Sequence, residues 1–500
     1  MLRLPKAGRR LQLGLVGSNH ANDILELFTG IRLHYLFNNE QSNVRTKKPL
    51  LQQLVCNKMQ QEIFACCVNF LELTRALVYF VKLTIVMRIR LPFIVVSFLM
   101  SSITMQGQKI ATIEVDISKP MKGLSMPVSL DLDAVTFQPD SALSLLEIKK
   151  NGRQPVPFQV DYKNRRVLSW LVNSDDDKIK KRVYELVTGP HLIKVSVLEA
   201  SVNDGALLLH AGDQKLLQYN FKTVYPPPGI DTAFRRSGFI HPLWTPSGKI
   251  LTRIQPPDHY HHYGIWNPWT HVLFEGDTVD FWSIKGRQGT VRFGNFVSVT
   301  TGPVYAEYQA LHEHVAFQKA GEKVALNELQ TVRVYKADNN ENNYIVDITI
   351  QLNCATASPF RILEYRYAGL GWRATEKWNK DNSMVLTSEG KDRRGADGST
   401  AKWALIQGAL DDDTGGLVMM SHPGNYNHPE PLRIWPENSN GGEMFAMFAP
   451  TKTKDWTLMP GKTYVLKYRF NVFSGQYTGQ LAENGWQYYR EPPKVTVKMN

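Results

Sequence analysis

The chain contains repeated stretches in which apolar and polar residues alternate. Isoleucine and valine occupy every second position of 112–117, with acids between them, and 344–352 and 465–473 have the same two-residue period. Such alternation predicts a strand with one buried and one solvent-facing side, as in antiparallel sheets. We therefore expect β-structure throughout the chain from about residue 108.

Turn-forming segments recur at the spacing of β-hairpins, and the chain has no long helical stripe of apolar residues. The turn segments are rich in Asn, Asp and Gly, at 338–343, 411–416 and 438–443. Glycine-rich dinucleotide and phosphate loops are missing from the sequence as well. The sequence therefore predicts an all-β protein. We expect an antiparallel β-sandwich, or its larger supersandwich form, preceded by a smaller β-sandwich module.

Three consecutive prolines mark a predicted domain boundary. The segment 225–229 reads YPPPG, and proline fixes φ and lacks the amide donor that a central strand needs. We expect an N-terminal β module over 108–224, this proline-rich linker, and a larger β domain over 230–485. A peripheral tail, 486–500, follows.

The N-terminal part has a different character. Residues 1–86 show no sustained periodicity, whereas Met87 is followed by two arginines, an uncharged run over 91–105 and a small residue, Gly107. That order is typical of a secretory signal peptide, and the run of about 15 residues is short for a membrane anchor, the alternative. We expect a non-native upstream extension over 1–86 and a signal peptide over 87–107. Cleavage near Gly107 would give a periplasmic or secreted protein without a membrane span.

The basic net charge comes mostly from this N-terminal part. The whole chain carries a formal +12, of which 1–86 contribute +6 and Arg88 and Arg90 two more, so that only +4 remains for 108–500. No basic run with interleaved aromatic residues is present, so we expect no nucleic-acid partner. The part after Gly107 has a single cysteine, Cys354, which excludes an internal disulfide.

The segment 256–282 is the richest in candidate chemistry, with four histidines and three tryptophans. Pro256 and Pro257 exclude a helix before it, so we expect a loop that joins two strands. If this loop is extended, His259 and His261 share one face while His262 points away. The histidines fit three roles: a metal site, proton transfer or substrate contact, and structural packing.

A metal site needs three or four converging ligands. His259 and His261 would supply two, and His422 or His428 a third. No cofactor follows from the sequence beyond this divalent metal. The tryptophans favour a sugar site, because indole rings pack against the apolar faces of sugars and their N–H groups bind acceptors. Each tryptophan taken alone is also a normal core residue of a sandwich.

These blocks resemble a known family. The segment 258–266 (DHYHHYGIW) matches a D-H-x-H-H-x-G-[LI]-W loop, 238–243 (GFIHPL) matches a block before it, and 280–282 (DFW) one after it. The pattern is similar to that of the bacterial family labelled "methane oxygenase PmoA". Tyr263 departs from the arginine of many members. The resemblance covers about 230–480.

The resemblance implies a context more than an activity. A methane oxygenase subunit would be an integral membrane bundle, which does not fit this sequence. Members are exported products of polysaccharide-using bacteria, and the block is faintly similar to galactose-mutarotase-like supersandwich proteins, in which histidines and a carboxylate move protons at a sugar. We therefore expect an exported carbohydrate-active protein with a carbohydrate as its partner.

The predicted enzyme is a hydrolase, lyase or epimerase that works by His/carboxylate acid–base chemistry. The alternatives are a non-catalytic carbohydrate-binding module and a divalent-metal protein with His259, His261 and His422 as ligands. The predicted catalytic residues are Asp258, His259, His261, Glu328 and His422. The predicted substrate-binding residues are His241, His262, Trp266, Trp269, Trp282, Arg373, Asn425 and Trp435.

Overall fold

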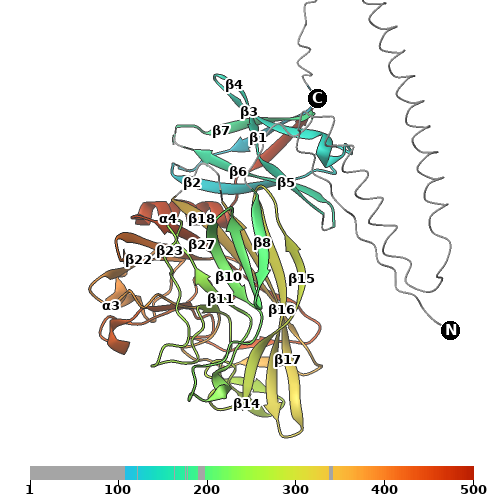
Figure 1. Ribbon diagram of the computed structural model, residues 1–500. Coiled ribbons are helices and arrows are strands. Elements are labelled where there is room, and N and C mark those ends of the chain that lie inside the picture. The colour runs from blue at the N-terminus through green and yellow to red at the C-terminus, as the bar shows by residue number, and fades with distance from the viewer. Residues whose placement is uncertain are drawn as a thin grey trace, which may run out of the picture. The chain divides into compact units, whose positions relative to one another are not determined.

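The computed structural model describes residues 107–500 apart from 121, 163, 175, 177, 190–196 and 337–341, and this part is mainly β-structure (Figure 1). Its strands form several antiparallel sheets, which confirms the predicted all-β class. The extension and signal peptide predicted before Gly107 lie outside the described residues. In the part that is described, no helix has the length and apolar character needed to cross a membrane.

Two small sheets form the N-terminal module. Their order is β28-β1-β7-β3-β4 in one and β2-β6-β5 in the other. Their apolar side chains alternate into a shared core, as the pattern over 112–117 predicts. The strands are β1 (Lys109–Asp116), β2 (Leu124–Asp131), β3 (Leu143–Lys149), β4 (Gly152–Val156), β5 (Phe158–Tyr162), β6 (Arg166–Ser174), β7 (Lys181–Thr188) and β28 (Val495–Met499), with the 3-10 helix η1 (Asp140–Ala142).

An eight-stranded sheet of long strands, here called the long-strand sheet, has the order β15-β16-β17-β18-β27-β23-β22-β21. Its hairpin between β22 and β23 turns at Asp411–Asp412, within the predicted turn segment 411–416. The strands are β15 (Gly289–Thr300), β16 (Tyr305–Gln318), β17 (Gly321–Tyr335), β18 (Asn343–Cys354), β21 (Ser383–Thr387), β22 (Trp403–Leu410), β23 (Asp413–Ser421) and β27 (Tyr464–Ser474).

A second eight-stranded sheet, here called the histidine sheet, has the order β24-β25-β20-β12-β11-β10-β9-β8. Because β10 pairs with β11, this sheet includes strands from both sides of the proline-rich segment 225–229. The strands are β8 (Leu198–Asn203), β9 (Ala206–Ala211), β10 (Gln214–Asn220), β11 (Phe239–Leu243), β12 (Ile265–Trp266), β20 (Gly371–Arg373), β24 (Leu432–Ile434) and β25 (Phe445–Phe448), with the 3-10 helices η2 (Thr232–Phe234) and η3 (Asn440–Gly442) nearby.

A four-stranded sheet and two short helices complete the fold. The sheet has the order β14-β13-β19-β26, with β13 (Val272–Phe274), β14 (Asp277–Val279), β19 (Phe360–Ile362) and β26 (Trp456–Leu458). The helices are α3 (Arg393–Ala396) and α4 (Gly479–Arg490). The Thr478 hydroxyl accepts a hydrogen bond from the Leu481 amide and caps α4. The tail continues into β28, which pairs with β1.

The two eight-stranded sheets share the main hydrophobic core, and this decides which side chains face outward. Ile350 of β18 and Ile265 of β12 both point into that core. Side chains alternate along a strand, so Thr349 of β18 points to the outer face of the long-strand sheet. Trp266 of β12 likewise lies on the outer face of the histidine sheet, in a separate aromatic cluster with Phe445.

Candidate functional site

The predicted histidine loop connects β11 and β12 and folds as consecutive tight turns. The amide of His259 donates to the carbonyl of Pro256, and the amide of His262 donates to the carbonyl of His259. The extended loop considered from the sequence is therefore wrong. Gly264, with φ of +57°, closes the segment, because a Cβ there would lie 2.2 Å from the carbonyl oxygen of Ile240.

These turns bring the three imidazoles together. The ring centroid of His262 lies 4.7 Å from that of His259 and 4.7 Å from that of His261. Trp435 lies 4.9 Å from His259, also between ring centroids. The expected separation of His262 from the other two therefore does not occur, since an i to i+3 turn places the first and last side chains on the same side.

Ion pairs run from this loop into the outer face of the histidine sheet. The Nδ1 atom of His259 lies 2.7 Å from Oδ2 of Asp258. Arg373 on β20 donates to both oxygens of Asp258 at 3.3 Å and also pairs with Glu443. Glu443 in turn accepts from Arg253 at 3.0 Å. Five side chains, all within one sheet or its loops, thus form a continuous chain of ion pairs and hydrogen bonds.

Burial sets the protonation state of most of these groups. It raises the pKa of Asp258, but the hydrogen bond from His259 and the charge of Arg373 outweigh it and leave that pKa below its ordinary value. Burial also lowers the pKa of Arg373 to about 10, so the guanidinium remains charged near neutrality. It lowers the pKa of His261 to about 3 and that of His262 well below its usual range. Both imidazoles are therefore neutral at physiological pH.

Neutral His262 is a structural member of the cluster. Its side chain is 1% exposed, and its Nδ1 accepts from Nη1 of Arg373 at 3.3 Å. It packs between the rings of Trp266 and Phe445. The predicted role of His262 in binding substrate would need this packing to open.

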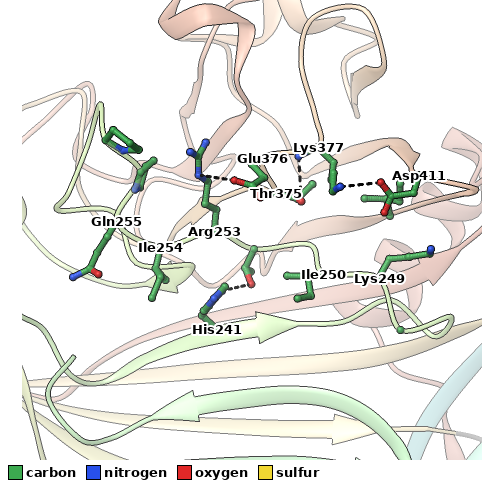
Figure 2. A pocket seen from close by; sticks show the side chains of 15 residues that line it. His241, Lys249, Ile250, Arg253, Ile254, Gln255, Thr375, Glu376, Lys377 and Asp411 are labelled. Atoms are coloured by element: carbon green, nitrogen blue, oxygen red, sulfur yellow. Dashed lines mark hydrogen bonds and ion pairs between the residues drawn. The ribbon is translucent and has the colours of Figure 1, made fainter. Parts of the chain in front are cut away.

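A cleft of about 570 Å³ lies beside the loop (Figure 2). It is lined by residues 241, 248–250, 252–257, 375–377, 410 and 411. Figure 2 shows Arg253 facing Glu376, with 3.8 Å between Nε and the carboxylate, and Lys377 paired with Asp411 at 2.9 Å. Asp258 and His259 are not among the lining residues but follow the cleft-lining Pro257 directly in the chain.

The predicted substrate residue His241 does line the cleft. Its Nδ1 lies 2.9 Å from the hydroxyl of Thr252. Burial lowers the pKa of His241 to about 4, so this ring is neutral near pH 7. His241 therefore offers its remaining nitrogen as a neutral hydrogen-bonding group.

The four predicted sugar-binding tryptophans are buried, with 0–4% of their surface exposed: Trp266, Trp269, Trp282 and Trp435. Trp269 belongs to the main core, and the other three support the histidine loop from behind. A stacked sugar needs an accessible indole face, and none of these rings offers one in this conformation. All four tryptophans are therefore core residues. This is the alternative that the sequence left open for each tryptophan taken alone.

Glu328 lies elsewhere, on the inner face of β17. Its carboxylate accepts from Nδ1 of His312 at 3.1 Å, from Nε2 of His314 at 3.0 Å and from Nδ2 of Asn267 at 3.0 Å. Burial would raise the pKa of Glu328, but the hydrogen bonds from the two histidines lower it to about 2. Glu328 has no exposed surface, so it is an internal anion that fixes Asn267 next to β12.

His422 and Asn425 lie in the loop that follows β23 of the long-strand sheet and not with the histidine loop. The ring of His422 packs against Tyr489 of α4, and Arg469 on the outer face of β27 lies 4.7 Å from the same tyrosine ring. The side chain of Asn425 donates to Glu430 at 2.8 Å. Because both eight-stranded sheets intervene, His422 cannot complete a metal site with His259 and His261. In the described ranges, no group of three or more His, Cys, Asp or Glu side chains is arranged to hold a metal ion.

Several residues of the site were not found from the sequence. Glu443 and the cleft residue Asp411 lie in predicted turn segments, 438–443 and 411–416, and the cleft residues Glu376 and Lys377 lie in a loop without a motif. His312 and His314 lie in the strand-like stretch LHEHVAF, at the positions that alternate with solvent-facing residues. Titratable residues at the apolar positions of a strand are a signal that would have found this pair.

Two solved structures show limited similarity to the chain. An alpha-mannosidase from Enterococcus faecalis V583 aligns with a TM-score of 0.37 and 10% identity, over 78% of this chain and 46% of that one. A protein in the glycosyl hydrolase family 38 from Enterococcus faecalis aligns with a TM-score of 0.36 and 9% identity, over 78% and 47%. The chain thus spans about half the length of these structures. No curated protein matches it.

A sequence family covers most of the fold that carries the site. Residues 206–487 match the family of unknown function DUF6807, from β9 to α4. The matched region includes the histidine loop, the cleft and the buried Glu328 network. It spans more than half of the 500 residues, and the chain therefore belongs to the DUF6807 family.

Proposed function

We propose that the protein is a carbohydrate-active enzyme in which His259 transfers a proton to or from a sugar bound in the cleft. The observation that supports this most strongly is the state of the His259 ring. Its Nδ1 is fixed by Asp258, its Nε2 has no hydrogen-bond partner among the described residues, and its side chain is 26% exposed. General base catalysis needs an imidazole that is oriented through one nitrogen and available at the other.

The proton balance follows from the ion pairs around the dyad. In the neutral tautomer, His259 donates its Nδ1–H to Asp258, and Nε2 carries the lone pair that accepts a substrate proton. The imidazolium so formed is stabilised by the adjacent carboxylate, which is itself held by Arg373. His261 stays neutral beside it and is able to donate or accept a hydrogen bond.

The lining of the cleft fits a polyhydroxylated ligand. Positive and negative side chains alternate along it, as in the Arg253–Glu376 and Lys377–Asp411 pairs, and Thr252, Thr375 and Gln255 add uncharged polar groups. Sugar hydroxyls both donate and accept hydrogen bonds, so they fit a surface that offers both. Buried tryptophans imply recognition by hydrogen bonds in place of ring stacking.

Proton transfer at His259 is common to hydrolysis, β-elimination and epimerisation, and each stays a candidate reaction. The signal peptide predicted at 87–107 would bring the enzyme to the periplasm or the outside of the cell, where polysaccharides are met. The alternative function, which the experiment must exclude, is carbohydrate binding without catalysis.

The test is a turnover and binding screen with neutral and acidic oligosaccharides. It compares the wild type, His259→Gln and the control His210→Gln. The wild-type His210 ring is hydrogen-bonded to the backbone carbonyl of Gly212, on another part of the histidine sheet. We expect turnover in the wild type and the control and its loss in His259→Gln, with binding retained. Equal binding by all three proteins without turnover in any of them would mean that the protein only binds sugar.

A further inference from the structure

A second hollow lies on the outer face of the long-strand sheet, far from the histidine loop. It has a volume of about 270 Å³ and is lined by residues of three adjacent strands: Glu307 and Gln309 of β16, Thr331, Arg333 and Tyr335 of β17, and Asp347, Thr349 and Gln351 of β18. Gln309 pairs with Thr331, and Thr331 pairs with Thr349, so these side chains form one row across the sheet.

The uncharged side chains of this hollow are free to bind a ligand. Gln309, Thr331, Thr349 and Gln351 are half-buried, and none of them has a side-chain hydrogen bond to any residue that the structure describes. Solvent-facing strand residues are often polar, but four uncommitted amide and hydroxyl groups in one concavity are a binding surface. Each of them can both donate and accept a hydrogen bond.

The charged residues at one end of the hollow are already paired. Arg333 binds Glu307 at 2.6 Å, and Arg469 holds Asp347 through two hydrogen bonds of 2.7 and 2.8 Å. Arg333 also stacks on the ring of Tyr305, 3.9 Å from its centroid. This end is therefore a stiff wall with no unpaired charge directed at a ligand, which disfavours a phosphate or a carboxylate and favours a neutral molecule.

We propose that this hollow, here called the sheet groove, is a second binding site for a neutral saccharide. Amide and hydroxyl groups in a row match the alternating donors and acceptors of neighbouring sugar hydroxyls. The sheet groove and the cleft have no lining residue in common, so we expect them to bind independently. The sheet groove would hold one part of a polysaccharide while another part of the same polysaccharide reacts in the cleft. This role of the groove rests on the proposed function.

The experiment measures the binding of cellohexaose, xylohexaose and mannohexaose by calorimetry. It uses wild-type protein, Thr331→Val/Thr349→Val, and the matched control Thr457→Val/Thr496→Val, which changes two exposed strand threonines on β26 and β28. Valine keeps the branched shape and favours strands, so the fold is preserved while two hydroxyls are removed. The cleft is tested in parallel with His259→Gln and His261→Ala.

We expect at least one hexasaccharide to bind about tenfold more weakly to Thr331→Val/Thr349→Val, because two hydrogen-bonding groups are lost. The control and both histidine variants should retain that binding. Unchanged affinity in the groove variant would overturn the sheet groove and leave the cleft standing. Loss of all saccharide binding in the histidine variants would overturn it too, since a single site would then account for the binding. The absence of binding to any of the three sugars in the wild type also contradicts the proposal.

Discussion

The Nδ1 atom of His259 lies 2.7 Å from Oδ2 of Asp258, and the same carboxylate accepts two hydrogen bonds from the buried Arg373. This relationship gives the His259 ring a defined orientation: the carboxylate, held by Arg373, fixes the imidazole that follows it in the chain.

Asp258→Asn tests this orientation. An amide in place of the carboxylate cannot stabilise an imidazolium, and its NH₂ group favours the wrong tautomer of His259. We expect turnover to fall on the order of 10²-fold or more, with little change in substrate affinity. Steady-state kinetics of the wild type and Asp258→Asn measure the two effects. A fall in affinity without a fall in turnover would show that Asp258 only helps to bind substrate.

Arg373 should matter for stability as well as for activity. Its side chain is 1% exposed, pairs with Asp258 and Glu443, and lies 4.6 Å from the Trp435 ring. Arg373→Met keeps the buried volume but removes the arginine paired with Asp258 and one of the two arginines paired with Glu443. Because both carboxylates are partly exposed, we expect a cost of about 2–3 kcal/mol. Urea unfolding measures this loss. Arg394→Met, which changes a largely exposed arginine, is the control and should change the free energy of unfolding by less than about 1 kcal/mol.

Glu328 should contribute to acid sensitivity. Its pKa is about 2 in the folded protein, against an ordinary value of 4.5, so the unfolded chain binds a proton more readily. The stabilisation is complete above pH 4.5 and is lost as the pH falls from 4.5 toward 2. Glu328→Gln should lower stability by several kcal/mol at pH 7 and flatten this part of the stability–pH curve. Thermal unfolding of both proteins between pH 3 and 7 tests this, and parallel curves would contradict it.

Glu430 should behave in the opposite way. It is fully buried, and burial raises its pKa to about 7 despite hydrogen bonds from Ser421, Asn425 and Tyr468. The folded protein therefore binds a proton that the unfolded chain releases above pH 4.5, and stability falls as the pH rises from 4.5 through 7. Glutamine mimics the neutral carboxyl, so Glu430→Gln should be more stable than the wild type at pH 8, by roughly 3 kcal/mol. If Glu430→Gln and the wild type have the same free energy of unfolding at pH 8, as well as at pH 5, this prediction is refuted.

The alternation of apolar and polar residues predicted correctly which face of each strand is buried, but it did not predict which strands pair with each other. On β18, Ile348 and Ile350 point into the core while Thr349 and Gln351 point outward, as the two-residue period predicts. The membership of β20 in the histidine sheet depends on its pairing with β12, which is distant in sequence and which a local pattern does not contain.

The histidine loop was predictable because its residues are close in sequence, and Arg373 and His241 were predicted from blocks outside this loop. Asp258, His259 and His261 were found because they share one loop, whereas Glu443 lies almost two hundred residues away and joins them only through Arg373. His422 was grouped with them by residue type alone, and the fold separates it by two sheets. The tryptophans were placed in the right segments but in the wrong environment, because Trp266, Trp282 and Trp435 are buried together in one aromatic cluster that composition does not reveal.

The most direct measurement of the central claim is chemical rescue of His259→Ala by added imidazole. The His259 ring is partly exposed, so free imidazole has access to the space that the side chain leaves beside Asp258. Proton transfer by His259 predicts that turnover is lost in the variant and returns in proportion to the imidazole concentration, while Asp258→Asn/His259→Ala is not rescued. Full turnover by His259→Ala without imidazole would contradict the account.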